Sequence, residues 1–200
     1  MAIFQYGIGR SKMSDSDSYL LGVISNHIAP SIEIFDRRIA KIVEIATTFA
    51  GNQLQQLIKS GSSAKGTAVR GTSDIDLFIS LKADTTNSLK DIYNMLDSRL
   101  KGNGIATRRQ NVSIGITYNG LEIDLVPGKI QSGYANYHSI YVSKRDTWMQ
   151  TNVKANIDMV TSSNRISEII LGKIWRKLHA LDFPSVYLNI PVRTCHRFRS

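Results

Sequence analysis

The 200-residue sequence has a single cysteine, four prolines and no long apolar run. One cysteine, Cys195, excludes an intramolecular disulfide and fits a reducing compartment. No segment approaches the roughly 20 apolar residues that cross a bilayer. Arg10 and Lys12 follow the short apolar stretch at the N-terminus, whereas a secretory signal begins with its basic residues. We therefore expect a cytoplasmic protein with no membrane partner.

The charge balance is strongly basic. Lys and Arg number 25 and Asp and Glu number 16, which gives a net charge of +9. Such a balance favours polyanionic partners, either nucleotides or nucleic acid. An ordinary basic surface would show the same balance, so the kind of partner has to come from motifs.

Three segments have the apolar spacing of three and four residues that is typical of an amphipathic helix. The first covers residues 32–49, with Ser31 as its expected N-cap and Gly51 as its end. The others cover residues 88–100 and 165–181. A polar run covers Ser14 to Ser18, and we expect a flexible tail over residues 1–17.

Alternating apolar residues predict three strands. They cover residues 74–81, 112–116 and 121–126, and Asn119-Gly120 between the last two is a strong hairpin signal. Pro127-Gly128 is expected to end the third strand. Residues 129–163 lack a clear pattern, apart from a short strand at 140–142. Strands and helices in this mixture indicate an α+β fold.

Three aspartates lie on the polar faces of these predicted strands. Asp74 and Asp76 are two residues apart, so both project from one face at a spacing of about 6.5–7 Å. Asp124 lies on the polar face of another strand, and Glu122 on the same face is a rival for its role. Carboxylates held side by side repel each other, and oxygen ligands select Mg²⁺ or Mn²⁺.

A glycine- and serine-rich loop precedes the first aspartates. Gly61-Ser62 offers backbone N–H groups that could cradle a phosphate chain. The loop lacks the Gly-Lys-Ser/Thr ending of a Walker A motif. An Asp-x-Asp pair alone is usually a solvated strand edge, and a glycine-rich loop alone is usually only a loop. The prediction of a nucleotide site therefore depends on their combination.

That combination resembles the signature of the DNA polymerase β-type nucleotidyltransferase superfamily. The matching run is Gly61-Ser62-x-Ala64-x-Gly66-Thr67-x-x-x-Gly71-x-Ser73-Asp74-Ile75-Asp76-Leu77, and Leu121 to Pro127 resembles the strand of the third carboxylate. The resemblance implies two Mg²⁺ ions, with Mn²⁺ as an alternative. It implies that Asp74 and Asp76 bind both ions, and that Asp124 serves one ion and helps to deprotonate the acceptor hydroxyl.

Within the superfamily, the sequence resembles the cGAS/DncV-like nucleotidyltransferases of bacterial anti-phage systems more than the archaeal CCA-adding enzymes. The later motifs that carry this likeness are Arg109-Gln110-Asn111-x-Ser113-Ile114, Trp148-x-x-Thr151-Asn152, Leu171-x-Lys173-x-Trp175 and Phe183-x-Ser185-x-Tyr187-Leu188. The resemblance implies that Lys173 and Ser185 contact phosphate oxygens. Lys173 could instead extend to solvent, and we expect Trp148 and Trp175 to be core residues.

The resemblance implies a polymerase β-like catalytic core over residues 18–160 and the start of a helical domain over residues 161–200. It implies an enzyme that joins nucleoside triphosphates into a cyclic or linear oligonucleotide second messenger, with RNA and a regulatory protein as optional partners. Two alternatives are nucleotide addition to an RNA end and nucleotide binding without turnover. The last alternative is suggested by the basic ending after Leu188, where the resemblance stops and a truncation is expected.

Overall fold

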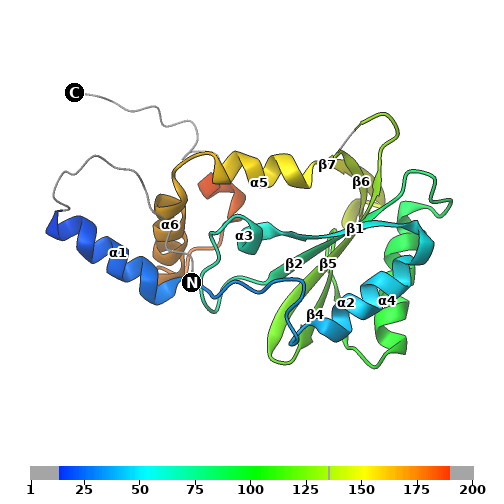
Figure 1. The fold of residues 1–200 in the computed structure, drawn as a ribbon, viewed down its shortest axis with the longest axis horizontal. Coiled ribbons are helices and arrows are strands. Elements are labelled where there is room, and N and C mark those ends of the chain that lie inside the picture. Colours follow the sequence, from blue (N-terminus) through cyan, green and yellow to red (C-terminus); the bar gives the residue numbers. More distant parts are fainter. Residues whose placement is uncertain (1–13, 135, 190–200) are drawn as a thin grey trace.

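The computed structural model describes residues 14–134 and 136–189. A mixed sheet forms its centre, with α2 and α4 at one side of the molecule and α1, α5 and α6 toward the other (Figure 1). None of the helices in these two ranges has the length and apolar content needed to span a membrane. The helices are α1 (Asp15–His27), α2 (Ala40–Ala50), α3 (Gly61–Ala64), α4 (Leu89–Gly102), α5 (Val153–Thr161) and α6 (Ile166–Leu178), and the strands are β1 (Leu54–Ser60), β2 (Ile75–Leu81), β3 (Thr107–Arg109), β4 (Ile114–Tyr118), β5 (Leu121–Ile130), β6 (His138–Val142) and β7 (Thr147–Thr151).

The sheet has the strand order β1-β2-β5-β4-β3, and β6 extends it by pairing with the second half of β5 and with β7. Only β2 and β5 run parallel to each other; the other pairs are antiparallel. The hairpin predicted at Asn119-Gly120 joins β4 and β5, and both residues have the positive φ that this tight turn requires (49° and 72°). The α+β prediction is confirmed.

The main core lies between the sheet and the pair α2 and α4. Alternate residues of β2 face it, and Ile75, Leu77, Ile79 and Leu81 are all buried there. The predicted stripe of α4 is also buried, at Ile92, Leu96 and Leu100, with Ser88 capping the helix as its sequence indicates. Because β2 gives its apolar face to this core, its opposite face carries the aspartates.

The first predicted helix is shorter than expected. It begins at Ala40 instead of after Ser31, although Gly51 does end it. Asp36 explains the difference, because its carboxylate accepts from the Arg38 backbone N–H (2.9 Å) and stabilises a turn in place of a helix. Phe35, which the periodicity assigned to the buried stripe, is consequently 94 % exposed.

Residues 121–163 are more regular than predicted. Pro127-Gly128 does not end β5, which continues to Ile130. Pro127 lies after the pairing of β5 with β4 has ended at Leu125 and before its pairing with β6 begins at Gly128. The strand β7 and the helix α5 were not predicted, because β7 is exposed along most of its length and shows no alternation.

The remaining helices build the other side of the molecule (Figure 1). A small cluster of Val69, Ile170 and Ile174 joins α6 to the loop before β2, and α1 adds partly buried side chains to it. The helix α1 begins at Asp15, inside the segment expected to be a tail, and Ser14 caps it in a capping box. Residues 1–13 and the basic ending at 190–200 lie outside the described residues.

Candidate functional site

Strand register sets Asp76 and Asp124 side by side. They are partners in the parallel β2–β5 pair. The same cross-strand row continues to Ser60 on β1 and Gly115 on β4. Neighbours in such a row point to the same face and lie about 5 Å apart. The two carboxylates are therefore adjacent and flanked only by small residues, and Asp74 lies two residues before Asp76 at the entry to β2.

Each aspartate holds its proton more tightly than an isolated carboxyl group does. Burial, followed by repulsion from Asp124 and Asp74, raises the pKa of Asp76 to about 6. Burial also raises the pKa of Asp124, with the Asp74 charge adding to the effect. The pKa of Asp74 is raised by burial and by Glu122. The structure thus concentrates negative charge where little water compensates it.

Gly61 makes room for the Asp76 carboxylate. A Cβ atom at position 61 would lie 1.7 Å from Asp76 Oδ2, and Gly61 has a φ of +60° that other residues rarely adopt. The backbone N–H of Ser62 lies against the same carboxylate and lowers its pKa slightly. The turn that the sequence suggested as a phosphate cradle therefore directly adjoins the aspartate pair.

Asp124 is held from the side of β4. Its Oδ1 accepts from Gln110 Nε2 (3.0 Å), and its Oδ2 faces the Ser113 hydroxyl (3.3 Å). Gly115 leaves this space open, because a Cβ atom there would lie 2.7 Å from Gln110 Nε2. The roles of Gln110 and Gly115 were not predicted, although Gln110 and Ser113 are part of the motif around residues 109–114.

Glu122, the rival of Asp124, has other partners. The hydroxyl of Thr117 donates to it (2.7 Å), and Arg108 forms an ion pair with it. The Thr117 hydrogen bond and Arg108 hold the pKa of Glu122 below its usual value. Glu122 is exposed and already neutralised, which favours Asp124 as the third member of the cluster.

A pocket of about 240 Å³ collects six of the seven residues that the sequence singled out: Gly61, Ser62, Asp74, Asp76, Lys173 and Ser185. Asp124 does not line this pocket and reaches it only through its neighbour Asp76. Seven other residues line the pocket, and sequence reasoning gave no role to four of them, Lys65, Thr67, Arg176 and Asn189. Lys65 is four residues after Gly61 and Arg176 three after Lys173, so helical spacing could have indicated both.

Lys173 is buried instead of extending to solvent. Only 5 % of the residue is exposed, and its Nζ donates to the Thr67 carbonyl oxygen (2.8 Å) and hydroxyl (3.0 Å). Burial, together with the positive charges of Lys65 and Arg176, lowers its pKa to about 8. These three cations gather at one wall of the pocket, and an anion would relieve their mutual repulsion.

The aspartates fit a divalent cation in the chemistry of their side chains. Their ligand atoms are all oxygen, and the repulsion that raises their pKa values is what a cation relieves. Across residues 14–134 and 136–189, no three His, Cys, Asp or Glu side chains are already gathered as a metal site. Asp76 faces Ser62 and Asp124 faces Gln110, so rotation of side chains, with the strands in place, would have to complete the site.

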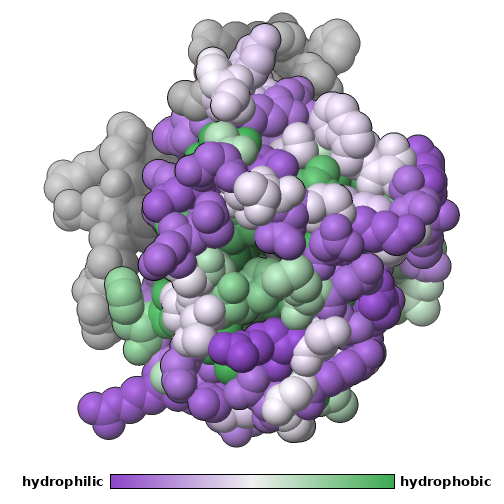
Figure 2. All heavy atoms as spheres, turned by 90° about the vertical axis from the view of Figure 1, so that its right-hand side faces the viewer, coloured by the Kyte–Doolittle hydropathy of each residue, from purple (hydrophilic) through white to green (hydrophobic). Residues whose placement is uncertain are grey.

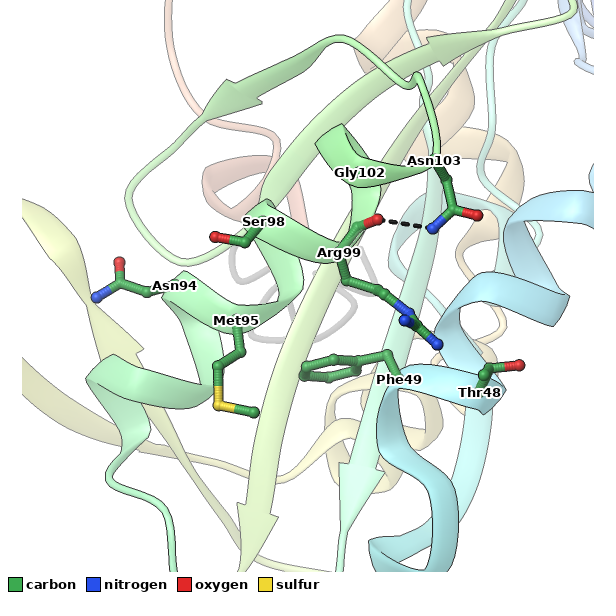
Figure 3. Close-up of a pocket in the computed structure, with 8 residues that line it drawn as sticks. All are labelled: Thr48, Phe49, Asn94, Met95, Ser98, Arg99, Gly102 and Asn103. Atoms are coloured by element: carbon green, nitrogen blue, oxygen red, sulfur yellow. Dashed lines mark hydrogen bonds between the residues drawn. The ribbon is translucent and has the colours of Figure 1, made fainter.

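A larger hollow, of about 670 Å³, lies away from the aspartates between α2 and α4. Phe49 and Met95 point into it from the two helices (Figure 3). From the side where α4 lies, the surface shows an apolar recess bordered by hydrophilic residues (Figure 2). This hollow is larger than the aspartate pocket but contains no carboxylate, so we assign the chemistry to the smaller pocket.

The two tryptophans are not core residues, contrary to expectation. Trp148 is 57 % exposed and Trp175 is 53 % exposed. Trp148 lies on the edge strand β7, and Trp175 projects from the side of α6 that faces away from the Val69 cluster. Tyr187, considered for base stacking or for the core, is also exposed.

The sequence is similar to a known family of protein domains and to a curated protein of that kind. Residues 17–164 match the Second Messenger Oligonucleotide or Dinucleotide Synthetase domain. The cyclic AMP-AMP-AMP synthase of Escherichia coli (strain MS 115-1) is 25 % identical over 147 residues, which are 66 % of this chain and 46 % of that protein. The chain thus spans about half the length of this curated relative.

Solved structures show the same fold. The E. coli MS115-1 CdnC structure with ATP has a TM-score of 0.63 at 20 % identity and covers 86 % of this chain and 63 % of its own. The Elizabethkingia meningoseptica CdnE cyclic dinucleotide synthase with GTP and Apcpp has a TM-score of 0.67 at 14 % identity, over 92 % and 76 %. Because the domain match covers well over half of the sequence, the chain belongs to the family of second messenger oligonucleotide or dinucleotide synthetase domains.

Proposed function

We propose that this chain is a metal-dependent nucleotidyltransferase that joins nucleoside triphosphates into a cyclic or linear oligonucleotide and releases pyrophosphate. One observation carries the proposal. The adjacent Asp76 and Asp124, with Asp74 beside them, adjoin a pocket that the cations Lys65, Lys173 and Arg176 also line. A triphosphate and its reacting α-phosphate require these two environments next to each other.

The triphosphate would bind at the wall of Lys65, Lys173 and Arg176. All three line the pocket with Ser62 and Ser185, which add hydroxyl donors. Lys173 already donates to Thr67, so it is held in place before a ligand arrives. Such preorganised donors are worth more in a buried pocket than in water.

Asp124 would receive the proton of the attacking hydroxyl. The acceptor oxygen forms a bond to the α-phosphorus as the bond to pyrophosphate breaks, and the hydroxyl proton passes to the carboxylate. Its raised pKa suits this role, and Gln110 fixes one of its oxygens. Two divalent ions, Mg²⁺ or Mn²⁺, would neutralise the phosphates and lower the pKa of the acceptor hydroxyl when bound by Asp74, Asp76 and Asp124.

The test is incubation with all four ribonucleoside triphosphates and Mg²⁺ or Mn²⁺, with chromatography and mass measurement of the products. We expect pyrophosphate and an oligonucleotide that resists phosphatase if it is cyclic. Asp124→Asn should reduce the rate of product formation at least about 100-fold, whereas the matched variant Glu122→Gln should form product at the wild-type rate. Product formation that survives Asp74→Ala combined with Asp76→Ala would show that the site is wrongly assigned.

A second candidate is nucleotide addition to an RNA end. The net charge of +9 favours it, because a polynucleotide acceptor would be attracted to a basic surface. The same incubation with a short labelled RNA separates the two. Extension of the RNA without product from triphosphates alone would support the second candidate, and metal-dependent binding with neither product would support nucleotide binding without turnover.

A further inference from the structure

Asn189 is a buried polar residue that the proposed chemistry does not use. It is 7 % exposed and lines the aspartate pocket. Its Oδ1 is the one buried side-chain nitrogen or oxygen atom of the described residues that has no hydrogen-bond partner there. A buried acceptor without a donor costs about 1–3 kcal/mol, so such an atom needs a physical reason.

The position of Asn189 is fixed by its neighbours. Residues 186–189 are helical, and Asn189 is four residues after Ser185, so both side chains lie on one face. Leu188 packs this segment onto α6, because a Cβ atom at Gly172 would lie 3.3 Å from its side chain. Gly172 directly precedes Lys173. Asn189 is therefore held one helical turn, about 5–6 Å, beyond Ser185 on the pocket wall.

The chemistry of Oδ1 limits what it can bind. An amide oxygen only accepts hydrogen bonds, and the phosphate oxygens of an ionised triphosphate also only accept. In the amide orientation of this structure, the partner of Oδ1 is therefore a donor. In a nucleoside triphosphate the ribose hydroxyls are the donors nearest to the phosphates, and the base amino group lies farther away. With the triphosphate at Lys65, Lys173 and Arg176, the ribose would follow it in the pocket.

We propose that Asn189 positions the ribose of the bound nucleoside triphosphate by accepting a hydrogen bond from its 2′- or 3′-hydroxyl through Oδ1. This inference rests on the proposed function, since it requires a triphosphate in the pocket. It adds a sugar-recognition residue to that function and explains why a buried amide oxygen is left without a partner in the described part of the chain.

The test compares the binding of ATP, 2′-deoxy-ATP, 3′-deoxy-ATP and tripolyphosphate by calorimetry, with Ca²⁺ to prevent turnover. The wild type should prefer ATP over one deoxy analogue by roughly 3- to 10-fold, the range of one hydrogen bond. Asn189→Leu, similar in size but without the acceptor, should lose that preference and still bind tripolyphosphate as the wild type does. Asn189→Asp keeps an acceptor oxygen and should keep the preference. Asn87→Leu, exposed in the loop before α4, is the control and should change nothing.

Thermal unfolding without ligand gives an independent readout. Because Oδ1 has no partner among residues 14–134 and 136–189, Asn189→Leu should melt at or above the wild-type temperature. A clearly lower melting temperature would mean that the protein itself satisfies Oδ1 and would overturn the inference. Equal affinity of the wild type for ATP and both deoxy analogues, or weaker tripolyphosphate binding by Asn189→Leu, would overturn it as well. A wild type that binds neither ATP nor tripolyphosphate would instead refute the proposed function, and the inference with it.

Discussion

The aspartate cluster should lower the stability of the metal-free protein, and Asp76→Asn measures by how much. The pKa of Asp76 is raised from 3.8 to about 6 by burial and by Asp124 and Asp74. At 1.36 kcal/mol for each pKa unit, ionised Asp76 costs the fold about 3 kcal/mol above pH 6, and residual contact with water reduces this to roughly 2. Asparagine has the same shape and no charge, so Asp76→Asn should unfold about 4–8 °C higher at pH 8.

The sign of the pH dependence follows from the raised pKa. Between pH 6 and pH 3.8 the Asp76 carboxyl binds more protons in the folded state than in the unfolded state, so the stability that ionised Asp76 costs is regained as pH falls through this window. The advantage of Asp76→Asn should therefore shrink from pH 8 to pH 4.5 in thermal melts with a chelator. Asp97→Asn is the control, and it should lower the melting temperature at pH 8 instead of raising it. Asp97 is also buried, but hydrogen bonds from Thr107 and Lys101 and the charge of Arg109 outweigh its burial and lower its pKa. A variant Asp76→Asn that is no more stable at pH 8, or whose advantage is the same at every pH, would refute the reasoning.

Three further predictions test two residues of the pocket and a buried histidine of β6. Gly61→Ala should place a methyl group against the Asp76 carboxylate and lower both the melting temperature and the triphosphate affinity. The control is Gly22→Ala, which should be neutral or stabilising, because a Cβ atom at position 22 has no other atom within 4 Å. Lys173→Met should weaken tripolyphosphate binding at least about tenfold, measured by calorimetry, because a buried donor at the cationic wall is lost; unchanged affinity would assign Lys173 only to Thr67. Burial lowers the pKa of His138, so protonation of this one side chain should cost stability as pH falls below 6.5. Chemical denaturation at pH 7 and pH 5 should therefore show a change in unfolding free energy that is more favourable for His138→Gln than for the wild type, and an equal change would contradict this.

The sequence predicted the centre of the molecule well because two local patterns determine it. Alternation along β2 assigned Ile75, Leu77 and Ile79 to the core and the aspartates to the opposite face. The turn at Asn119-Gly120 placed β5 as the return strand of a hairpin. Once those elements were known, parallel register between β2 and β5 was the one missing step, and it brings Asp76 and Asp124 together.

The failures occurred where a specific contact, local in one case and tertiary in the other, overrides the periodic pattern. The periodic stripe over residues 32–49 looked like one helix, but a side-chain hydrogen bond to the backbone at Asp36 delays the helix to Ala40. Pro127-Gly128 looked like a stop signal, yet β2 continues to pair with β5 through both residues. Gly128 lies where a Cβ atom would be 2.5 Å from the Phe78 ring, so its absence of a side chain serves packing against the sheet. Single-sequence patterns contain neither contact.

Lys173 is a case in which the sequence indicated the residue but not its environment. Its place beside an apolar stripe predicted a solvent-exposed amine as readily as a phosphate ligand, and only the fold shows that its amine is buried against Thr67. Thr67 follows the glycine loop and precedes the aspartates, so this contact ties α6 to the loop that carries Gly61 and Ser62. A substitution in the pocket should therefore affect the position of α6, and a substitution in α6 should affect the pocket. The helical segment is thus part of the candidate site, and its cations and Asn189 should be tested together with the aspartates.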